Sequence, residues 1–396
     1  MMRRRPAAGF LTGVLCLALV CALPRPAHAE VVIEIIYIER QLPQPPTLSN
    51  LAAPPEDEGV AGARLAIVDN AATGKFLGHD YKLRELIVPP KADFLAAVKK
   101  ALAERPASYA VVKAPADDLL AVADLPEMRD ALIFNAGAAD TRLRDADCRG
   151  NVLHTAPSRA MLADALMQFL VKKRWANLFL VAGPNPGDQL FAEAVRRAAR
   201  KFRLKLVADK PWPFAADMRR TAQSEIPVFT QDVDYDILIV ADETNDFGEY
   251  LLYQTWLPRP VAGTQGLAPT AWNPVIEQWG AAQLQSRFQK QAGRPMRAGD
   301  FNVWSGVRVI GEAVTIVNSG DFGKIAAFIR SPEARFAQYK KSGLSFRPWN
   351  GQLRQPIPLV HSGAVVALAP LEGFLHEGSE LDTLGIDAPE SKCKFQ

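Results

Sequence analysis

The sequence predicts an α/β protein built from two parallel-sheet lobes. Short apolar strands rich in β-branched residues alternate with helices, which is the pattern of parallel sheets covered on both faces. The alternation runs to about residue 138, is interrupted by a loop over 140–150, and then restarts. With 396 residues, the chain is long enough for two lobes that each bury their own apolar core.

The first run of strands and helices begins with "VVIEIIYIE" over 31–39, an apolar and β-branched strand. The next segment, 57–74, has apolar residues at helical spacing and ends at Gly74, a residue typical of helix C-termini. Further strands are predicted over 81–88, 109–114 and 131–138, and further helices over 92–105 and 116–125.

The second run starts at "NVLHTAPS" and continues with a helix over 159–173. Strands are then predicted over 177–183, 204–209 and 234–242, and helices over 188–202, 247–256, 275–293, 300–318 and 321–341. A segment rich in Pro and Gly over 257–274 is predicted to connect the lobes. "WNG" at 349–351 is typical of a hairpin turn, and the last thirty or so residues are expected to be irregular.

The first 29 residues are predicted to be a cleavable secretory signal. Three arginines over 3–5 precede a mostly apolar run over 7–23, and "AHA" at 27–29 offers small residues at the −3 and −1 positions. The alternative, an uncleaved membrane anchor, calls for a longer apolar run. We therefore expect a soluble, exported protein.

Removal of this segment changes the net charge of the chain. The formal charge is +3, and residues 1–29 hold four arginines and no acid, so the mature chain is close to −1. No basic cluster remains, and nucleic acid is not an expected partner. Cys148 and Cys393 are the cysteines left after cleavage, and either one disulfide or two free thiols is compatible with an oxidising compartment.

Residues 237–250, "ILIVADETNDFGEY", place four acids directly after an apolar strand. Acids favour the positive end of the next helix, which explains Asp246 and Glu249. The carboxyl ends of strands in α/β sheets are also where ligands bind, and Glu243 is the acid that we expect to face a ligand. Asp242, Glu243 and Asp246 could alternatively gather on a hard cation, but their spacing lacks a calcium-loop pattern and no metal site is predicted.

The sequence carries no enzyme signature. A Gly-x-Ser-x-Gly elbow, a His-Glu-x-x-His zinc helix and a Cys-x-x-Cys pair are all absent. "DNAATGK" at 69–75 has Asp69 where a phosphate loop needs its first glycine. The protein is therefore not predicted to be an enzyme, and no catalytic residue or cofactor is assigned.

Several stretches together resemble a known family: "GVAGARLAIVDNAATGKFLG", "FNAGA", "NVLHTAPSRAMLADAL", "PVAGTQG" and "LSFRPWNGQLRQP". They resemble the periplasmic ligand-binding proteins of branched-chain-amino-acid-type ABC transporters, and most closely the subgroup associated with PQQ-dependent alcohol dehydrogenase systems. The resemblance covers nearly all of residues 32–390. It implies the type I periplasmic binding protein fold, two doubly wound parallel-sheet lobes joined by three crossing segments.

The resemblance also implies the boundaries of the lobes. The crossings are expected near 138–150, 257–268 and 343–352. Lobe 1 then comprises 30–145 and 263–345, lobe 2 comprises 146–262 and 346–380, and 381–396 is a C-terminal tail.

In amino-acid-binding relatives, hydroxyl groups hold the ligand carboxylate and an acid holds its ammonium group. Here Ala139 matches the hydroxyl position, Gln265 matches the amine-binding acid, and Glu243 matches an aromatic residue. Because buried charges need partners, we expect a small polar ligand other than an ordinary α-amino acid. The candidate lining residues are Tyr37, Glu39, Asn135, Gly137, His154, Thr155, Asp242, Glu243, Thr264, Gln265 and Trp272.

Some of these residues also fit purely structural roles. His154 is more often a packed residue than a ligand-binding one, and Trp272 fits either the core or the cleft. Trp279, seven residues further along a predicted helix, is expected in the core. Arg40 and Arg354 are expected on the surface.

The resemblance implies that the protein, as a monomer, hands its ligand to the permease and ATPase subunits of an importer linked to PQQ-dependent alcohol oxidation. An alternative keeps the fold but makes the chain a sensor, or an adaptor for a quinoprotein dehydrogenase or a metal-handling partner. The weakened amino-acid pocket motivates that alternative. Neither the identity of the ligand nor the direction of transport follows from the sequence.

Overall fold

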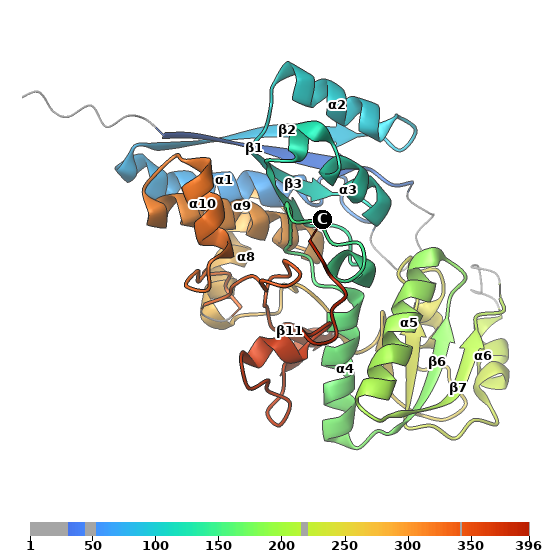
Figure 1. The fold of residues 1–396 in the computed structure, drawn as a ribbon. Coiled ribbons are helices and arrows are strands. Elements are labelled where there is room, and N and C mark those ends of the chain that lie inside the picture. The colour runs from blue at the N-terminus through green and yellow to red at the C-terminus, as the bar shows by residue number, and fades with distance from the viewer. Residues whose placement is uncertain (1–30, 44–52, 215–220, 341–342, 396) are drawn as a thin grey trace, which may run out of the picture.

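The computed structural model describes residues 31–43, 53–214, 221–340 and 343–395. The predicted signal segment lies outside these residues. Within them the chain forms two parallel sheets that lie in separate lobes (Figure 1), with a small antiparallel sheet beside the second.

The first lobe is built on a parallel sheet of order β2-β1-β3-β4-β5. Side chains alternate between its faces, as expected for strands. Ile35 and Tyr37 face one apolar cluster, with helices α1, α8, α9 and α10, whereas Ile36 and Ile38 face another, with α2 and α3. The elements are β1 Val31–Arg40, α1 Val60–Leu77, β2 His79–Val88, α2 Phe94–Glu104, β3 Tyr109–Lys113, α3 Ala116–Ala123, β4 Leu132–Asn135, β5 Val152–His154, α8 Ala281–Ala292, α9 Ala298–Val317 and α10 Phe322–Arg330.

The second lobe is built on a parallel sheet of order β7-β6-β8-β9, again with helices on both faces. Leu180 and Ile239 pack with α4 and α5, and Val181 and Val240 pack with α6 and α7. The antiparallel sheet β10-β11-β12 covers α4. The elements are α4 Arg159–Lys173, β6 Asn177–Ala182, α5 Pro186–Lys201, β7 Lys205–Pro211, α6 Ala222–Thr230, β8 Ile237–Ala241, α7 Gly248–Leu251, β9 Val261–Gly263, β10 Ala268–Pro269, β11 Ile357–His361 and β12 Ala364–Ala369.

The predicted fold class is therefore confirmed: two doubly wound parallel-sheet lobes share one chain, which passes between them three times before its C-terminal segment. These passages lie between His154 and Arg159, between Pro269 and Trp272, and between Leu353 and Ile357, where buried residues change from one lobe's cores to the other's.

Each passage lies later in the chain than predicted. The boundary at 145 placed β5 in the second lobe, but β5 pairs with β4 in the first sheet. The boundary at 345 placed Phe346 and Leu353 in the second lobe, but both belong to the first lobe's core. The predicted C-terminal tail packs against both lobes, since Leu381 and Leu384 are buried in the cores of the first and second lobes.

Three predicted helices are shorter than expected. The helix over 247–256 is reduced to α7, and Tyr253 beyond it has a positive φ of 74°. The helix over 321–341 ends at Arg330, two residues before Pro332, which disfavours helical backbone at the residue that precedes it. The helix over 275–293 begins only at Ala281, so Trp279, expected in the core, lies before it with a φ of 54° and is 45% exposed.

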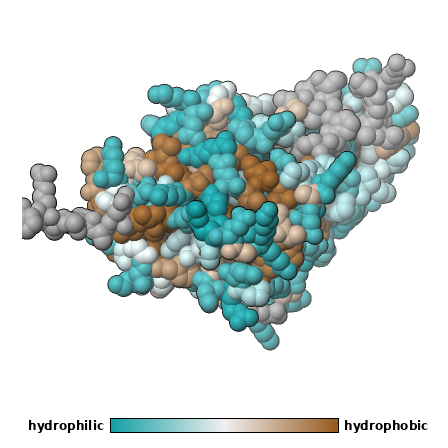
Figure 2. All heavy atoms as spheres, turned by 90° about the horizontal axis from the view of Figure 1, so that it is seen from above, coloured by the Kyte–Doolittle hydropathy of each residue, from teal (hydrophilic) through white to brown (hydrophobic). Residues whose placement is uncertain are grey.

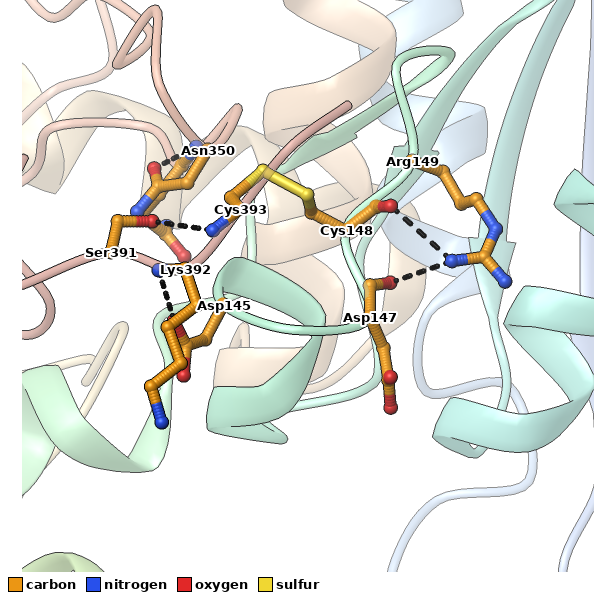
Figure 3. The surroundings of a disulfide bond; sticks show 9 residues. Asp145, Asp147, Cys148, Arg149, Asn350, Ser391, Lys392 and Cys393 are labelled. Atoms are coloured by element: carbon orange, nitrogen blue, oxygen red, sulfur yellow. Dashed lines mark hydrogen bonds between the residues drawn. A yellow bond between two sulfur atoms is a disulfide. The ribbon is translucent and has the colours of Figure 1, made fainter. Parts of the chain in front are cut away.

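Cys148 and Cys393 form a disulfide, the alternative that the sequence left open (Figure 3). Cys148 lies in the loop between β4 and β5 and is buried. Beside the bond, the backbone N–H of Lys392 donates to Asp145 Oδ1 at 2.6 Å. The C-terminal segment is thus joined covalently to the first lobe after it has contributed Leu384 to the core of the second.

The surface is polar between scattered apolar side chains. Figure 2, which looks down on the molecule from the side of α2 in Figure 1, shows separate brown patches divided by teal polar groups. Among the residues that the structure describes, no helix has the length and apolar character that a membrane span requires.

We predict that removing the disulfide lowers stability. The bond closes a loop of 245 residues, so its loss enlarges the conformational freedom of the unfolded chain and is expected to cost about 2–5 kcal/mol. Thermal unfolding followed by circular dichroism should show a lower Tm for the Cys148→Ser/Cys393→Ser variant. A reductant should lower the Tm of the wild type and leave that of the variant unchanged; equal Tm values for both proteins would contradict the prediction.

Candidate functional site

Arg159, the first residue of α4, brings the carboxyl ends of the two sheets together. Its Nε and Nη2 donate to the two carboxylate oxygens of Glu243, just after β8, at 2.7 Å each. Its Nη1 donates at 2.9 Å to Asp140, which follows β4. A single guanidinium thus contacts an acid from each lobe.

Burial disfavours the charge of Arg159, whose side chain is 11% exposed. The hydrogen bonds and charges of Glu243 and Asp140 outweigh that effect and raise the pKa of the guanidinium. Ser158 caps α4 through the N–H of Met161, and the N–H of Arg159 donates to the Ala139 carbonyl at 2.8 Å. The backbone that carries Arg159 is therefore fixed by both lobes.

Asp242 is a structural acid, although the sequence placed it among the ligand-binding residues. It is fully buried, and its oxygens accept hydrogen bonds from the backbone N–H groups of Asp246, Phe247 and Gly248 at 2.7–2.9 Å. These bonds hold the turn after β8. The neighbouring Glu243 donates its own backbone N–H to Asp188 at 2.7 Å and turns its side chain outward to Arg159.

Thr264 and Gln265 reinforce the same turn. Thr264 Oγ1 accepts from the N–H of Asp242 at 2.8 Å, and Gln265 Nε2 donates to the Asp242 carbonyl at 2.9 Å and to Asn245 at 2.8 Å. The Gln265 carbonyl oxygen accepts from the hydroxyl of Thr264 at 2.5 Å. The polar groups of both side chains are thus used inside the second lobe.

In the first lobe, Tyr37 and Glu39 join Lys113 in a small network where β1 and β3 end. The hydroxyl of Tyr37 donates to Glu39 at 2.5 Å, and Lys113 Nζ donates to the other oxygen at 2.9 Å and to the carbonyl of Glu58. Burial first, and then the charge of Glu39, raise the pKa of Tyr37, which stays protonated. Lys113 is the most exposed of the three.

Asn135 and His154 lie side by side at the carboxyl ends of β4 and β5. The Asn135 carbonyl oxygen accepts from the N–H groups of Gly137 and Ala138, so its amide donates, and it lies 3.0 Å from His154 Nδ1. Nδ1 therefore accepts, and the ring is the neutral tautomer with its hydrogen on Nε2. Burial and the nearby Arg144 lower the pKa of His154 well below 6.5.

Buried polar side chains tie two of the passages between the lobes together. Gln355 donates to the Thr155 carbonyl at 2.7 Å, and Gln352 donates to the carbonyls of His154 and Ala156. The hydroxyl of Thr155 donates to the Asn302 carbonyl at 2.8 Å.

Arg144 completes this network. It donates to the carbonyls of Ala138, Asp140 and Ala156 and to Gln352 at 2.7–3.0 Å. Burial lowers the pKa of Arg144 to about 9, so its charge persists at neutral pH.

Trp272 takes one of the two places that the sequence left open, and Arg354 differs from what the sequence suggested. Trp272 is 2% exposed and stacks on Phe301 at 4.6 Å between ring centroids, so the core, and not a ligand, occupies its ring. Arg354 was expected on the surface, but its side chain is 15% exposed and pairs with Asp382 at 2.8 Å. Arg40 is also partly covered, by Asp118 at 3.1 Å.

A cavity of about 450 Å³ lies elsewhere in the described part of the chain. It is lined by Tyr253, Trp256, Arg259 and His361 among others, and it opens beside Pro260, at the amino end of β9. A cavity of about 280 Å³ lies at the amino edge of the first sheet. Neither adjoins Arg159.

The acids of the turn after β8 do not form a cation site. Amides hold Asp242, Arg159 holds Glu243, and Asp246 accepts from Asn185 and Thr244 at 2.9 Å. Within the described ranges, no group of three or more His, Cys, Asp or Glu side chains is placed to hold a metal ion.

Two comparisons match known proteins. The family model described as periplasmic binding protein matches residues 47–224. A branched-chain amino acid ABC transporter periplasmic ligand-binding protein from Burkholderia xenovorans LB400 superposes with a TM-score of 0.70 at 16% identity, covering 92% of this chain and 99% of that one. The fold is that of a type I periplasmic binding protein.

Other solved structures share this fold. The leucine-, isoleucine-, valine-, threonine- and alanine-binding protein from Brucella ovis, in a closed conformation, gives a TM-score of 0.69 at 16% identity over 92% of this chain and 99% of its own. An ABC transporter solute-binding protein from R. palustris in complex with benzoate gives 0.64 at 12% identity, covering 93% and 100%. Comparison with curated protein sequences gives no match. At these identities the likeness establishes the fold alone.

Sequence reasoning missed Arg159, Asp140 and Arg144, the charged residues that the structure places where the lobes meet. Arg159 lies in "APSRAML", where Ser158 indicates the start of a helix. An arginine in the first turn of a helix is expected to be exposed. The available signal was its position at the start of the helix after β5, since ligands of α/β sheets bind beyond the carboxyl ends of strands.

We predict that Asp242→Asn destabilises the second lobe. An amide nitrogen in place of one carboxylate oxygen would face backbone N–H donors, at a cost of roughly 1–3 kcal/mol. Urea unfolding should show this loss. Asp246→Asn, on the same turn but more exposed, should change stability by less, and an equal loss in the two variants would contradict the assigned role.

We also predict a pH dependence that arises from His154. Its pKa is lower in the folded state than the unfolded value near 6.5, so below that pH the unfolded chain binds a proton that the folded chain does not. Stability should therefore fall as the pH drops from 7 to 5, by at most about 1.4 kcal/mol per pH unit from this residue. Urea unfolding across this range should give a shallower fall for His154→Asn, and parallel curves would refute the assignment.

Proposed function

We propose that this protein is the periplasmic solute-binding component of an ABC transporter and binds a small polar ligand between its lobes. The observation that carries the proposal is the contact of Arg159 with acids from both lobes. It brings the carboxyl ends of β4 and β8 to one point, and ligands of α/β sheets bind at such ends.

The proposed mechanism is closure of the lobes around the ligand. A ligand that contacts both lobes favours the closed state by its difference in affinity for the two states. The passages between the lobes act as the hinge, and Gln352, Gln355 and Arg144 keep them in register through hydrogen bonds to backbone carbonyls.

The residues around this point support a ligand other than an ordinary α-amino acid. Gln265, at the position of the amine-binding acid, is neutral, and its amide nitrogen donates to the Asp242 carbonyl and to Asn245. Ala139 has no hydroxyl, and the backbone N–H of Arg159 donates to its carbonyl. The structural neighbour in complex with benzoate indicates that this fold accommodates ligands without an amino group.

The wider assignment rests on the sequence resemblance. It supports delivery of the ligand to the permease and ATPase subunits at the inner membrane, a link to PQQ-dependent alcohol oxidation, a periplasmic location and a monomeric state. No catalytic role is part of the proposal.

A second candidate is a sensor or adaptor for a quinoprotein dehydrogenase or a metal-handling partner. One observation favours it: most of the polar side chains expected to bind ligand, Asp242, Thr264, Gln265 and Asn135 among them, are committed to internal hydrogen bonds.

A ligand screen separates the two candidates. Thermal-shift measurements on the mature protein with small alcohols, carboxylic acids, amino acids and metal ions should reveal a ligand that raises the Tm, because binding to the folded state stabilises it. Small-angle X-ray scattering with that ligand should show a smaller radius of gyration. A blank screen, together with co-purification of a periplasmic protein partner, would favour the adaptor.

A further inference from the structure

We infer that Arg159 recognises a carboxylate of the ligand and that Glu243 occupies the place of that carboxylate in the ligand-free protein. The inference rests on the proposed function, because it names the class of ligand for the same site. It adds a specificity residue and an internal competitor, neither of which the sequence predicted in these roles.

The pairing of Arg159 with Glu243 has the geometry of a recognised carboxylate. Two parallel N–H groups donate to the two oxygens at 2.7 Å each, which is the bidentate form that arginine makes with carboxylates. The third donor, Nη1, stays with Asp140 at 2.9 Å. Asp140 can therefore hold the guanidinium in place while the carboxylate on its other edge is exchanged.

The two partners differ in how firmly they are held. Arg159 begins a helix of 15 residues, and its side chain is 11% exposed. The side chain of Glu243 is 28% exposed, and among the described residues Arg159 is the partner recorded for its carboxylate. Because Asp188 fixes the backbone of Glu243, the carboxylate can swing away without unfolding the turn.

The first turn of α5 is shaped around the carboxylate of Glu243. Gly187 lies there, and a Cβ at this position would come within 2.6 Å of Glu243 Oε2. The close approach places a negative group beside the positive end of a helix of 16 residues, which favours anions. A ligand carboxylate in the same place would gain the same two attractions.

The opposite assignment is a cationic ligand that replaces the guanidinium between Asp140 and Glu243. It would require the more deeply buried and helix-anchored partner to move, and it would leave Arg159 without its acids. Separating a buried cation from its partners leaves its charge uncompensated, which is strongly unfavourable. The geometry therefore favours exchange of Glu243.

The experiment compares three ring compounds of similar size and different charge: benzoate, benzamide and benzylamine, with acetate and lactate as smaller carboxylates. Isothermal titration calorimetry is performed on the mature full-length protein and on Glu243→Gln. The variant loses the internal competitor, so we expect it to bind a carboxylate about tenfold more tightly than the wild type does, or ~1.4 kcal/mol. The affinity for benzylamine should not rise in the variant.

Matched variants test the roles of the other groups. Glu85→Gln breaks a bidentate pair with Arg64 of the same 2.7 Å geometry on the first lobe, and should leave affinity unchanged. Arg159→Gln/Glu243→Gln, which leaves no unpaired charge at the bidentate contact, should fold and lose the carboxylate affinity. Gly187→Ala, added to Glu243→Gln, should lower the carboxylate affinity, because its Cβ would crowd the place that the ligand carboxylate takes.

The inference is tested by whether the carboxylate affinity of Glu243→Gln is higher or lower than that of the wild type. Weaker carboxylate binding by Glu243→Gln, preference for benzylamine, or unchanged affinity in the Arg159→Gln/Glu243→Gln variant would overturn it while leaving solute binding intact. Binding of only neutral compounds, by the wild type and Glu243→Gln alike, would do the same. If neither the panel nor the wider thermal-shift screen yields a ligand for either protein, the inference and the proposed function fail together.

Discussion

The charge of Arg159 is the constraint on which the meeting of the two lobes depends. A guanidinium with little solvent contact must be paired, because an uncompensated buried cation costs several kcal/mol. The chain meets this requirement with one acid from each lobe, Asp140 and Glu243. The carboxyl ends of β4 and β8 are thereby held to a common point, which is the geometry that the proposed binding of a solute between the lobes requires.

The passages between the lobes obey a related constraint. Where the chain leaves one sheet for the other, the carbonyls of Thr155 and Ala156 lie beyond the strand ladder, and buried unpaired carbonyls are costly. Arg144, Gln352 and Gln355 supply donors to them. Buried polar side chains that contribute nothing to either apolar core therefore hold the passages between the lobes.

The sequence predicted the two sheets well because strand periodicity and helix capping are local signals. It placed β1, α4 and β6 within about a residue of their observed ends. The predicted helix boundaries were wrong where they depended on backbone conformations that residue type does not indicate, such as the positive φ of Tyr253 and Trp279. The lobe boundaries were misplaced because β5 is three residues long and finds its partner β4 across a loop.

The functional side chains were harder to predict because residue type does not reveal which hydrogen bonds are already made. Asp242 and Glu243 are adjacent acids after the same strand, yet the first holds three backbone amides and the second holds an arginine. The two roles depend on each other: Asp242 fixes the turn, and the turn presents Glu243 to Arg159. In the proposed exchange, this internal carboxylate lowers the affinity for any ligand that must displace it. It would also pair the cation of the ligand-free protein and exclude ligands too weakly charged to compete.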